Sequence, residues 1–295
     1  MILLWYRILL LLTIKHDRLN MNLSRKKNAN FLEQLSISTE IKRYWDLLSV
    51  LIPQNLNARY RGSFLGVYWS LLNPLIMTGL YTTIFGATFA SYFDNSIVNY
   101  MMAAFTGLLV INFYSSSTTQ ALSSVVVNGE LLNKIKLPVP VFPLAMIGSN
   151  IFQFMVGSFP LLAIVTIINT YNPLNIILLL LPFICLVLVC TGVGFFVSAL
   201  FVFFRDLGYF YEIATFVLWI TSPIFYPAEI VPKSVQPFLH LNPLVSIIES
   251  LRTISLNGVL PEPIELLRGF LSGIIILVLG WLFFKKVESS FMDLL

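Results

Sequence analysis

The chain has 295 residues, of which 57% are hydrophobic and 11% are charged. Ordinary soluble domains carry about 25% charged residues, so the composition excludes a soluble globular protein and predicts an integral membrane protein. The formal net charge is +4, but the basic residues flank apolar segments instead of forming a separate basic domain. This arrangement reflects membrane topology, and we expect no nucleic-acid partner.

Residues 1–40 are expected to form a flexible cytoplasmic segment. The apolar run at residues 2–14 is too short to cross a bilayer, which requires about 20 residues. It is interpreted either as an interfacial anchor or as sequence ahead of a start at Met21. The chain then becomes polar and basic, with three consecutive cations at residues 25–27, and we predict an electrostatic role for this part.

An amphipathic helix is predicted over residues 41–52. Its apolar residues recur at helical spacing, and charged residues fall between them. The apolar set is Ile41, Tyr44, Trp45, Leu48, Leu51 and Ile52. A helix of this kind lies at the membrane surface, so we expect a cytoplasmic interface helix ahead of the first span.

Residues 41–295 as a whole are predicted to form one all-α transmembrane domain with six spans. Long gaps between ionisable residues mark the spans, because a charge at the bilayer centre costs about 2.5 to 3.5 kcal/mol. The longest gap, residues 137–204, contains the turn-rich sequence Asn169–Pro173 and therefore divides into two helices. The spans are placed near residues 67–90, 98–114, 141–168, 174–203, 207–226 and 266–284.

The distribution of Lys and Arg predicts the orientation of these spans. Most lie before the first span, in the loop after the second, or after the sixth, and only Lys233, Arg252 and Arg268 lie on the other side. By the positive-inside rule, both termini are cytoplasmic. Segment 227–265 is then a non-cytoplasmic loop that contains short helices or a re-entrant turn.

The sequence lacks the residues expected of several other membrane proteins. No carboxylate or histidine lies near the centre of a predicted span, which argues against an ion-coupled carrier. The chain contains no Gly-Lys dipeptide, and therefore no phosphate-binding loop of the GxxxxGK[ST] type. Cys185 and Cys190 lack the spacing of metal ligands. We predict no catalytic residue, metal or cofactor in this chain.

A membrane-bound glycan-modifying enzyme is the alternative from a different class. Such an enzyme needs an acid, a base or metal ligands close together near one face of the membrane. The outer segment offers Glu229, His240 and Glu249, and an inner loop offers Arg205 and Asp206. No motif unites these residues, so transport is the preferred interpretation.

Four motifs resemble those of the ABC-2 type permeases that export O-antigen, capsular polysaccharide and teichoic acid. They are RYRGSFLGVYWSLLNP (Arg59–Pro74), NGELLNKIKLP (Asn128–Pro138), FFRDLGYF (Phe203–Phe210), and SPIFYP with HLNPL (Ser222–Pro227 and His240–Leu244). They occur in the family's order and spacing, and the resemblance covers most of the chain after Ile41. The second motif departs from the family pattern at Asn133 and Leu137, where a basic residue and a Phe are expected.

The resemblance implies an exporter assembled from separate chains. Two copies of this chain would form a homodimer, each docked on an ATPase subunit that binds ATP and Mg²⁺. The cargo would be a polysaccharide linked to a polyprenyl phosphate lipid, exported across the bacterial inner membrane. The alternatives within transport are export of a small drug or lipid, or of teichoic acid, and the aromatic-rich first span favours polysaccharide.

Two inner elements are candidates for contact with the ATPase. The charged stretch Glu130–Lys136 forms either a coupling helix or an ordinary solvated loop. In the next inner connection, the two charged residues either face the ATPase or pair with each other. The candidate coupling residues are Glu130, Leu131, Asn133, Lys134, Arg205 and Asp206.

The residues before the first span are candidates for contact with the lipid carrier. Arg59 and Arg61 flank Tyr60 at the cytoplasmic entrance, where guanidinium groups suit lipid phosphates. The alternative interpretation is that both arginines anchor the chain to anionic headgroups.

An aromatic stripe in the first span is a candidate path for the glycan. Tyr81, Phe85 and Phe89 recur every four residues and therefore share one helix face. Such a face either stacks against sugar rings as the polymer slides past or packs against lipid and neighbouring helices.

Overall fold

The computed structural model describes residues 40–135, 137–239 and 241–295. The predicted N-terminal segment up to residue 39, together with Lys136 and His240, lies outside the described residues. The chain divides into two compact units, residues 1–49 and 50–295. Every regular element in the described ranges is helical, which confirms the all-α prediction.

The predicted interface helix is longer than expected. Residues 40–60 are helical, so the helix continues past the predicted end at Ile52. A proline in a helix interior ordinarily interrupts it, whereas this helix runs through Pro53. Its position at the membrane surface stays a prediction.

Four helical segments in the described ranges are long and apolar enough to cross a membrane, and they match the second, third, fourth and sixth predicted spans. They are Ile97–Lys134, Val141–Thr170, Leu174–Phe203 and Pro263–Asp293. The first comprises α3 (Ile97–Val127) and α4 (Gly129–Lys134), and the last comprises α12 (Pro263–Val287) and a 3₁₀ turn (Glu288–Asp293).

The third and fourth predicted spans each contain an irregularity. In the third, α5 (Val141–Gln153) and α6 (Phe159–Thr170) are joined by a π-helical turn (Phe154–Ser158). The fourth consists of a short α7 (Leu174–Leu178) and the long α8 (Leu180–Phe203). Both helical segments nevertheless cover the predicted ranges.

The helices in the first and fifth predicted spans are not among the segments that are long and apolar enough to cross a membrane. The first corresponds to α2 (Trp69–Phe89), flanked by 3₁₀ turns at Gly66–Tyr68 and Ala90–Tyr92. Its sequence includes Asn73 and several threonines. The fifth corresponds to α9 (Leu207–Thr221), which has 15 residues. The count of six spans therefore stays a prediction.

The predicted end of the fifth span is wrong. Helix α9 ends at Thr221 and does not reach Tyr226, because Ser222 adopts an extended conformation with φ −80° and ψ 139°. A residue before proline is driven towards this region by the proline ring, and Pro223 follows.

The predicted end of the second span is also too early, because α3 continues past Tyr114 to Val127. Two of its hydroxyl side chains after Tyr114 donate to carbonyls of their own helix, Thr118 to Tyr114 at 2.8 Å and Ser124 to Ala121 at 2.6 Å. These two are therefore buried with their hydrogen bonds satisfied. At 31 residues the helix is about 46 Å long, which exceeds the roughly 30 Å hydrocarbon core.

The segment between α9 and α12 contains short elements. They are a 3₁₀ turn (Ala228–Ile230), α10 (Gln236–Leu239), α11 (Pro243–Arg252) and a π-helical turn (Thr253–Asn257). The side chain of Asn242 caps α11 by accepting a hydrogen bond from the Leu244 amide at 3.0 Å. Leu244, Val245 and Ile248 are buried, so α11 packs into the bundle, against α3, α8 and α12.

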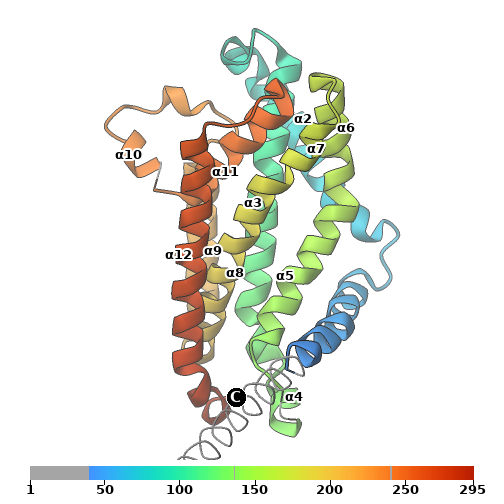
Figure 1. Cartoon of the computed structure of the whole chain (residues 1–295), viewed down its shortest axis with the longest axis vertical. Coiled ribbons are helices and arrows are strands. Elements are labelled where there is room, and N and C mark those ends of the chain that lie inside the picture. The colour runs from blue at the N-terminus through green and yellow to red at the C-terminus, as the bar shows by residue number, and fades with distance from the viewer. Residues whose placement is uncertain (1–39, 136, 240) are drawn as a thin grey trace, which may run out of the picture. The chain divides into compact units, whose positions relative to one another are not determined.

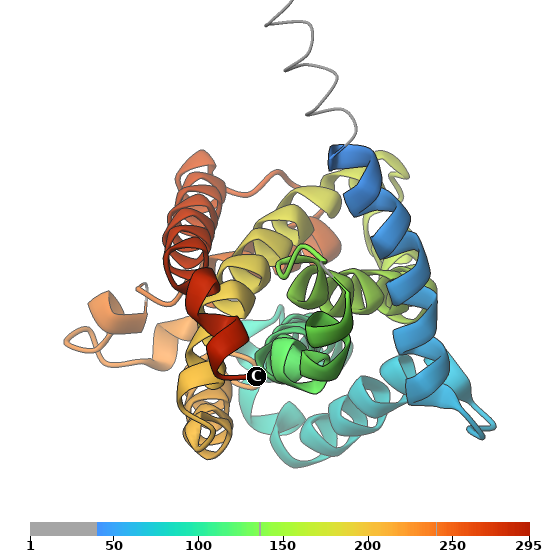
Figure 2. The same ribbon diagram turned by 90° about the horizontal axis from the view of Figure 1, so that it is seen from below.

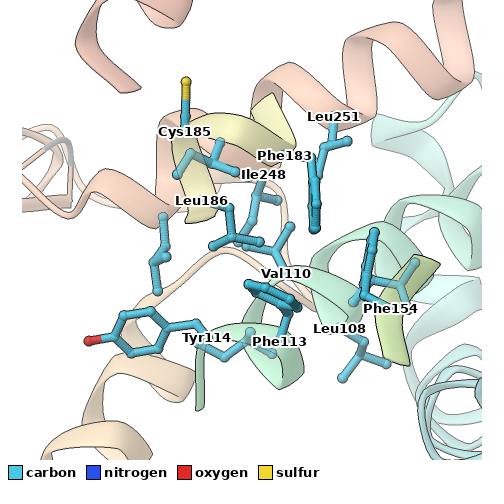
Figure 3. Close-up of a cluster of buried hydrophobic side chains, with 14 of the residues drawn as sticks. Leu108, Val110, Phe113, Tyr114, Phe154, Phe183, Cys185, Leu186, Ile248 and Leu251 are labelled. Atoms are coloured by element: carbon cyan, nitrogen blue, oxygen red, sulfur yellow. The ribbon is translucent and has the colours of Figure 1, made fainter. Parts of the chain in front are cut away.

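Helix α3 lies at the centre of the bundle formed by residues 50–295 (Figure 2). The main hydrophobic cluster joins α3, through Leu108, Val110 and Phe113, to α8 and α11 (Figure 3). The rings of Phe154 and Phe183 stack there, with centroids 4.6 Å apart. Helix α4 and the end of α12 lie at one end of this bundle, called the α4 end, and α11 lies towards the other, the α11 end (Figure 1).

Candidate functional site

The α4 end carries the first group of predicted coupling residues. Helix α4 follows α3 after Asn128, whose amide donates to the Ser124 carbonyl at 2.8 Å. Leu132 is buried, whereas Asn133 points outward. Glu130 and Lys134 form an ion pair of 3.8 Å with both side chains largely exposed. The predicted coupling stretch is therefore a short helix with a charged outer face up to Lys134.

The second predicted coupling pair lies at the same end. Phe291 is fully buried and packs edge-on against Phe203 and Phe284, so the end of α8 lies beside the 3₁₀ turn after α12. A Cβ atom on Gly129 of α4 would contact the Leu295 side chain at 3.4 Å. These contacts connect α4 to the α8–α9 connection through the last residues of the chain.

Arg205 and Asp206 are both exposed in that connection. The Arg205 guanidinium lies over the Phe201 ring, 5.9 Å from its centroid. The described structure contains no ion pair between Arg205 and Asp206 within 4.0 Å. Mutual pairing, one of the two predicted explanations for these charges, is therefore not what the structure shows.

The two arginines at the predicted entrance lie in different environments. Arg59 is half-buried, and its guanidinium donates to side-chain oxygens of Gln120 on α3 and of Asn150 and Gln153 on α5. The bond to Asn150 is 3.2 Å. Asn150 also donates to Gln120 at 2.9 Å. Arg59 therefore connects the end of helix 40–60 to two helices of the bundle.

This amide cluster leaves the charge of Arg59 without a counterion among the described carboxylates, since none lies within ion-pair distance. Arg61, by contrast, is exposed and lines an open groove of 770 Å³ along residues 50–61. The groove is otherwise lined by neutral side chains. Of the two predicted arginines, only Arg61 is available to a ligand in this conformation.

Tyr60, the residue between them, lines two cavities. One is the open groove that contains Arg61. The other is a smaller cavity of 190 Å³ between α2, α3 and the α5–α6 segment, lined by several amide and hydroxyl side chains. Tyr60 therefore borders both a cationic groove and a neutral polar cavity.

The predicted aromatic stripe forms one helix face, as the spacing required. Tyr81 stacks on Phe85 with centroids 6.1 Å apart, and Phe85 stacks on Phe89 at 6.0 Å. Tyr81 also stacks on Phe225 at 3.5 Å and lies 6.1 Å from the Trp219 ring. The stripe therefore extends into a larger aromatic face, shared between α2, α9 and the segment that follows α9.

A separate cavity of 540 Å³ lies at the α11 end, and it includes two residues of the enzyme alternative, Glu229 and Glu249. Burial, and next the negative charge of Glu265, raises the pKa of Glu249 to about 7. Arg252 lines the same cavity but is tied down, donating to the Ala103 carbonyl at 3.0 Å and to that of Ile224 at 2.8 Å. No group of three or more His, Cys, Asp or Glu residues suited to a metal occurs in the described ranges.

The amide partners of Arg59 were missed by the sequence interpretation. Asn150 and Gln153 are three residues apart in an apolar span and therefore lie on one helix face. Polar side chains in such a span ordinarily bond across helices, so this spacing was the available signal. Gln120 was missed because the second span was ended at Tyr114.

Relatives of known role align with most of the chain. An O-antigen export system permease protein from Klebsiella pneumoniae is 30% identical over 254 residues, covering 85% of this chain and 95% of that protein. The protein of the same name from Myxococcus xanthus is 29% identical over 226 residues, which cover 76% of this chain and 85% of that protein. A capsule polysaccharide export inner-membrane protein from Neisseria meningitidis is 22% identical, covering 74% and 79%.

The match to a family model covers the same region. The ABC-2 type transporter family matches residues 46–256, which include helices α2 to α11 and all the candidate residues described above. This match and the full-length similarity to the Klebsiella protein agree with the resemblance seen in the four motifs. The chain belongs to the ABC-2 type transporter family.

Proposed function

We propose that this chain is the membrane subunit of an ABC exporter that moves a lipid-linked polysaccharide outward across the bacterial inner membrane. The carrying observation is the similarity to O-antigen export permeases over as much as 95% of their length. The capsule export proteins add a second set of relatives with the same class of cargo in their names. Polysaccharide is common to both sets.

In the proposed assembly, two copies of this chain form a homodimer and each docks on one ATPase subunit. ATP and Mg²⁺ bind to the ATPase subunits, because this sequence has no phosphate-binding loop. Both termini and the α4 end lie in the cytoplasm, helix 40–60 lies at the inner surface of the membrane, and the domain has six spans. The exposed charges of α4 support its role as the docking element.

The proposed energy transfer uses helix packing at the α4 end. Closure of the ATPase subunits on ATP pushes on α4, with Glu130, Leu131, Asn133 and Lys134 at the contact, and on the connection at Arg205 and Asp206. Helix α4 directly continues the central helix α3, and the α8–α9 connection joins two further helices. Movement at these points therefore reaches the bundle, whose packed helices shift between discrete arrangements.

The proposed entrance uses Arg61 and Tyr60, with Arg59 in a supporting role. Arg61 faces the open groove, where its guanidinium can bind a lipid phosphate with two parallel hydrogen bonds. Arg59 is occupied by amide oxygens and fixes the chain segment that carries Arg61. This division of roles replaces the equal roles that the sequence alone gave to both arginines.

The proposed path of the glycan follows the aromatic face that includes Tyr81, Phe85 and Phe89. Aromatic rings stack on the apolar faces of sugars without requiring one particular hydrogen-bond pattern, so a repetitive polymer can slide along them. Exporters of small drugs or lipids, or of teichoic acid, are the alternatives in transport. A glycan-modifying enzyme with Glu229 and Glu249 is the remaining alternative, and the names of the relatives argue against it.

Purification of the tagged chain from its native membrane in mild detergent tests this proposal. We expect a separate ATPase to co-purify in equal amount and to hydrolyse ATP in a vanadate-sensitive manner. Polysaccharide on its lipid carrier, isolated from the same bacterium, should stimulate that hydrolysis more than the carrier without sugar. Equal stimulation by both would support export of a lipid, and the absence of an ATPase would favour the enzyme.

A further inference from the structure

The small cavity beside Tyr60 has the lining of a sugar-binding site. It lies between α2, α3 and the π-helical turn that joins α5 to α6, and its volume is 190 Å³. At about 30 Å³ per water molecule, it has the volume of about six waters, which is close to that of one hexose ring. The lining residues used below are Tyr60, Trp69, Asn73, Asn112, Phe113 and Gln153.

Two amide side chains in this cavity lack partners. Neither Asn73 on α2 nor Asn112 on α3 makes a hydrogen bond to another residue in the described part of the chain. Asn73 is exposed and Asn112 is half-buried, so both amides are accessible to a bound molecule. Each amide offers two donor hydrogens and one acceptor oxygen, so the pair indicates a polar occupant that both donates and accepts.

The lining also selects the kind of occupant. No charged side chain lines the cavity, so it offers neither the cations that a phosphate requires nor the carboxylates that a metal ion requires. Amides and hydroxyls alternate with aromatic rings such as Trp69 and Phe113. This combination matches a neutral sugar, whose hydroxyls bond to amides while its carbon–hydrogen face packs on an aromatic ring.

The neighbouring groove supplies the other half of the ligand. It contains Arg61, and it shares Tyr60 with the cavity. Because Tyr60 lines both spaces, a phosphate bound at Arg61 would lie next to the cavity, and the sugar attached to that phosphate would be placed to enter it.

We propose that this cavity binds the sugar directly attached to the carrier phosphate. The proposal rests on the proposed function, because that function supplies a sugar joined to a lipid phosphate. It adds a specific site: Asn73 and Asn112 hydrogen-bond to the sugar hydroxyls, and Trp69 packs on the ring. The permease then recognises the start of the polymer, whereas the aromatic face described above contacts any repeat unit.

Binding measurements on the full-length chain in lipid nanodiscs test this site. The two probes are a short-chain polyprenyl pyrophosphate bearing one N-acetylhexosamine and the same lipid pyrophosphate without sugar. We expect the sugar to increase affinity for the unmodified chain about tenfold, the effect of one or two hydrogen bonds. In Asn73→Leu and Asn112→Leu this gain should disappear, whereas binding of the sugar-free probe should remain and show that the variants fold.

The matched control is Thr83→Leu. Thr83 lies on an exposed face of α2, donates only within its own helix, to Gly79 at 2.8 Å, and does not line the cavity. The Thr83→Leu variant should still bind the sugar-bearing probe about tenfold more tightly than the sugar-free probe. A gain that persists in both asparagine variants, or that is absent from the unmodified chain, overturns the sugar site. A sugar-dependent gain in a chain that fails to export polysaccharide when reconstituted with its ATPase would instead overturn the proposed function and leave the site standing.

Discussion

Gly280 on α12 lies against the backbone of Gly192 on α8. A Cβ atom on Gly280 would overlap the carbonyl oxygen of Gly192, and a Cβ atom on Gly192 would come within 2.5 Å of the Ile276 and Leu277 backbone. The two helices run in the same direction, since Phe195 contacts Trp281 and Phe203 contacts Phe291. Glycine at both positions allows the closest approach of two helices that membrane packing permits.

Alanine at position 280 should therefore destabilise the protein. The added methyl group has no space and must separate α8 from α12, at a cost of about 1 to 3 kcal/mol. Thermal unfolding of the purified chain in mild detergent measures the effect. Gly79→Ala is the control, because nothing lies within 4 Å of its Cβ position, and it should unfold at the same or a higher temperature. Equal unfolding temperatures for the two variants would contradict the close contact.

The two entrance arginines should differ when each is replaced by methionine. Arg59→Met removes the guanidinium that bonds to Gln120, Asn150 and Gln153. Each such bond to a charged group contributes about 1.5 to 3 kcal/mol, so the unfolding temperature should fall clearly. Arg61→Met removes an exposed side chain, and stability should hardly change, whereas affinity for a lipid pyrophosphate should fall. A loss of stability in Arg61→Met together with a loss of lipid pyrophosphate affinity in Arg59→Met would contradict this assignment.

Reversal of the α4 charges should weaken ATPase docking. Glu130→Lys replaces a negative charge by a positive one, a change of two charge units, and so repels any ATPase cation that Glu130 contacts. The amount of co-purified ATPase measures the loss of this contact. The double variant E130K/K134E restores the internal ion pair, which at this exposure contributes at most about 0.5 kcal/mol. We expect the double variant to remain impaired. Its recovery would show that the pair serves only the stability of α4.

Glu229→Lys is the control for that experiment. Glu229 is exposed near the α11 end, which lies outside the cytoplasm in the proposed topology. Its reversal should leave the amount of bound ATPase unchanged. Loss of the ATPase in this variant would contradict the assignment of the α4 end as the docking surface.

The half-buried carboxyl of Glu249 should make stability depend on pH. Its pKa is raised from the ordinary 4.5 to about 7, chiefly by burial, so ionisation is harder in the folded than in the unfolded state. Stability should therefore be highest below pH 4.5, fall as the pH rises towards 7, and stay low above it. Glu249→Gln should reduce this loss of stability, because glutamine does not ionise. The measurement is the difference between the unfolding temperatures at pH 5 and pH 8. The same difference in the variant and in the unmodified chain would contradict the raised pKa.

The sequence was sufficient to predict a helix and its boundaries where the apolar residues are continuous. The fourth predicted span, residues 174–203, coincides with a helical segment of the structure, because no ionisable residue interrupts it and a turn-rich sequence precedes it. The aromatic stripe was equally accessible, since a spacing of four residues places Tyr81, Phe85 and Phe89 on one helix face.

The sequence was insufficient where polar residues are satisfied by tertiary structure. The predicted second span ended at Tyr114, before a run of serines and threonines, although Thr118 and Ser124 donate hydrogen bonds within α3. Arg59 looked equivalent to Arg61 because its partners Gln120 and Asn150 are distant along the chain. The cavity beside Tyr60 also depends on three segments that no local pattern connects.

Polysaccharide translocation in sealed vesicles tests directly whether this chain exports a lipid-linked polysaccharide. The chain is reconstituted with its ATPase so that the nucleotide sites face outward, and lipid-linked polysaccharide is added outside with ATP and Mg²⁺. We expect the glycan to become protected from an added glycosidase only while ATP is hydrolysed, and we expect Arg61→Met to reduce the rate of protection. Hydrolysis of ATP without protection of the glycan, while a small drug or a bare lipid is moved instead, would contradict polysaccharide export.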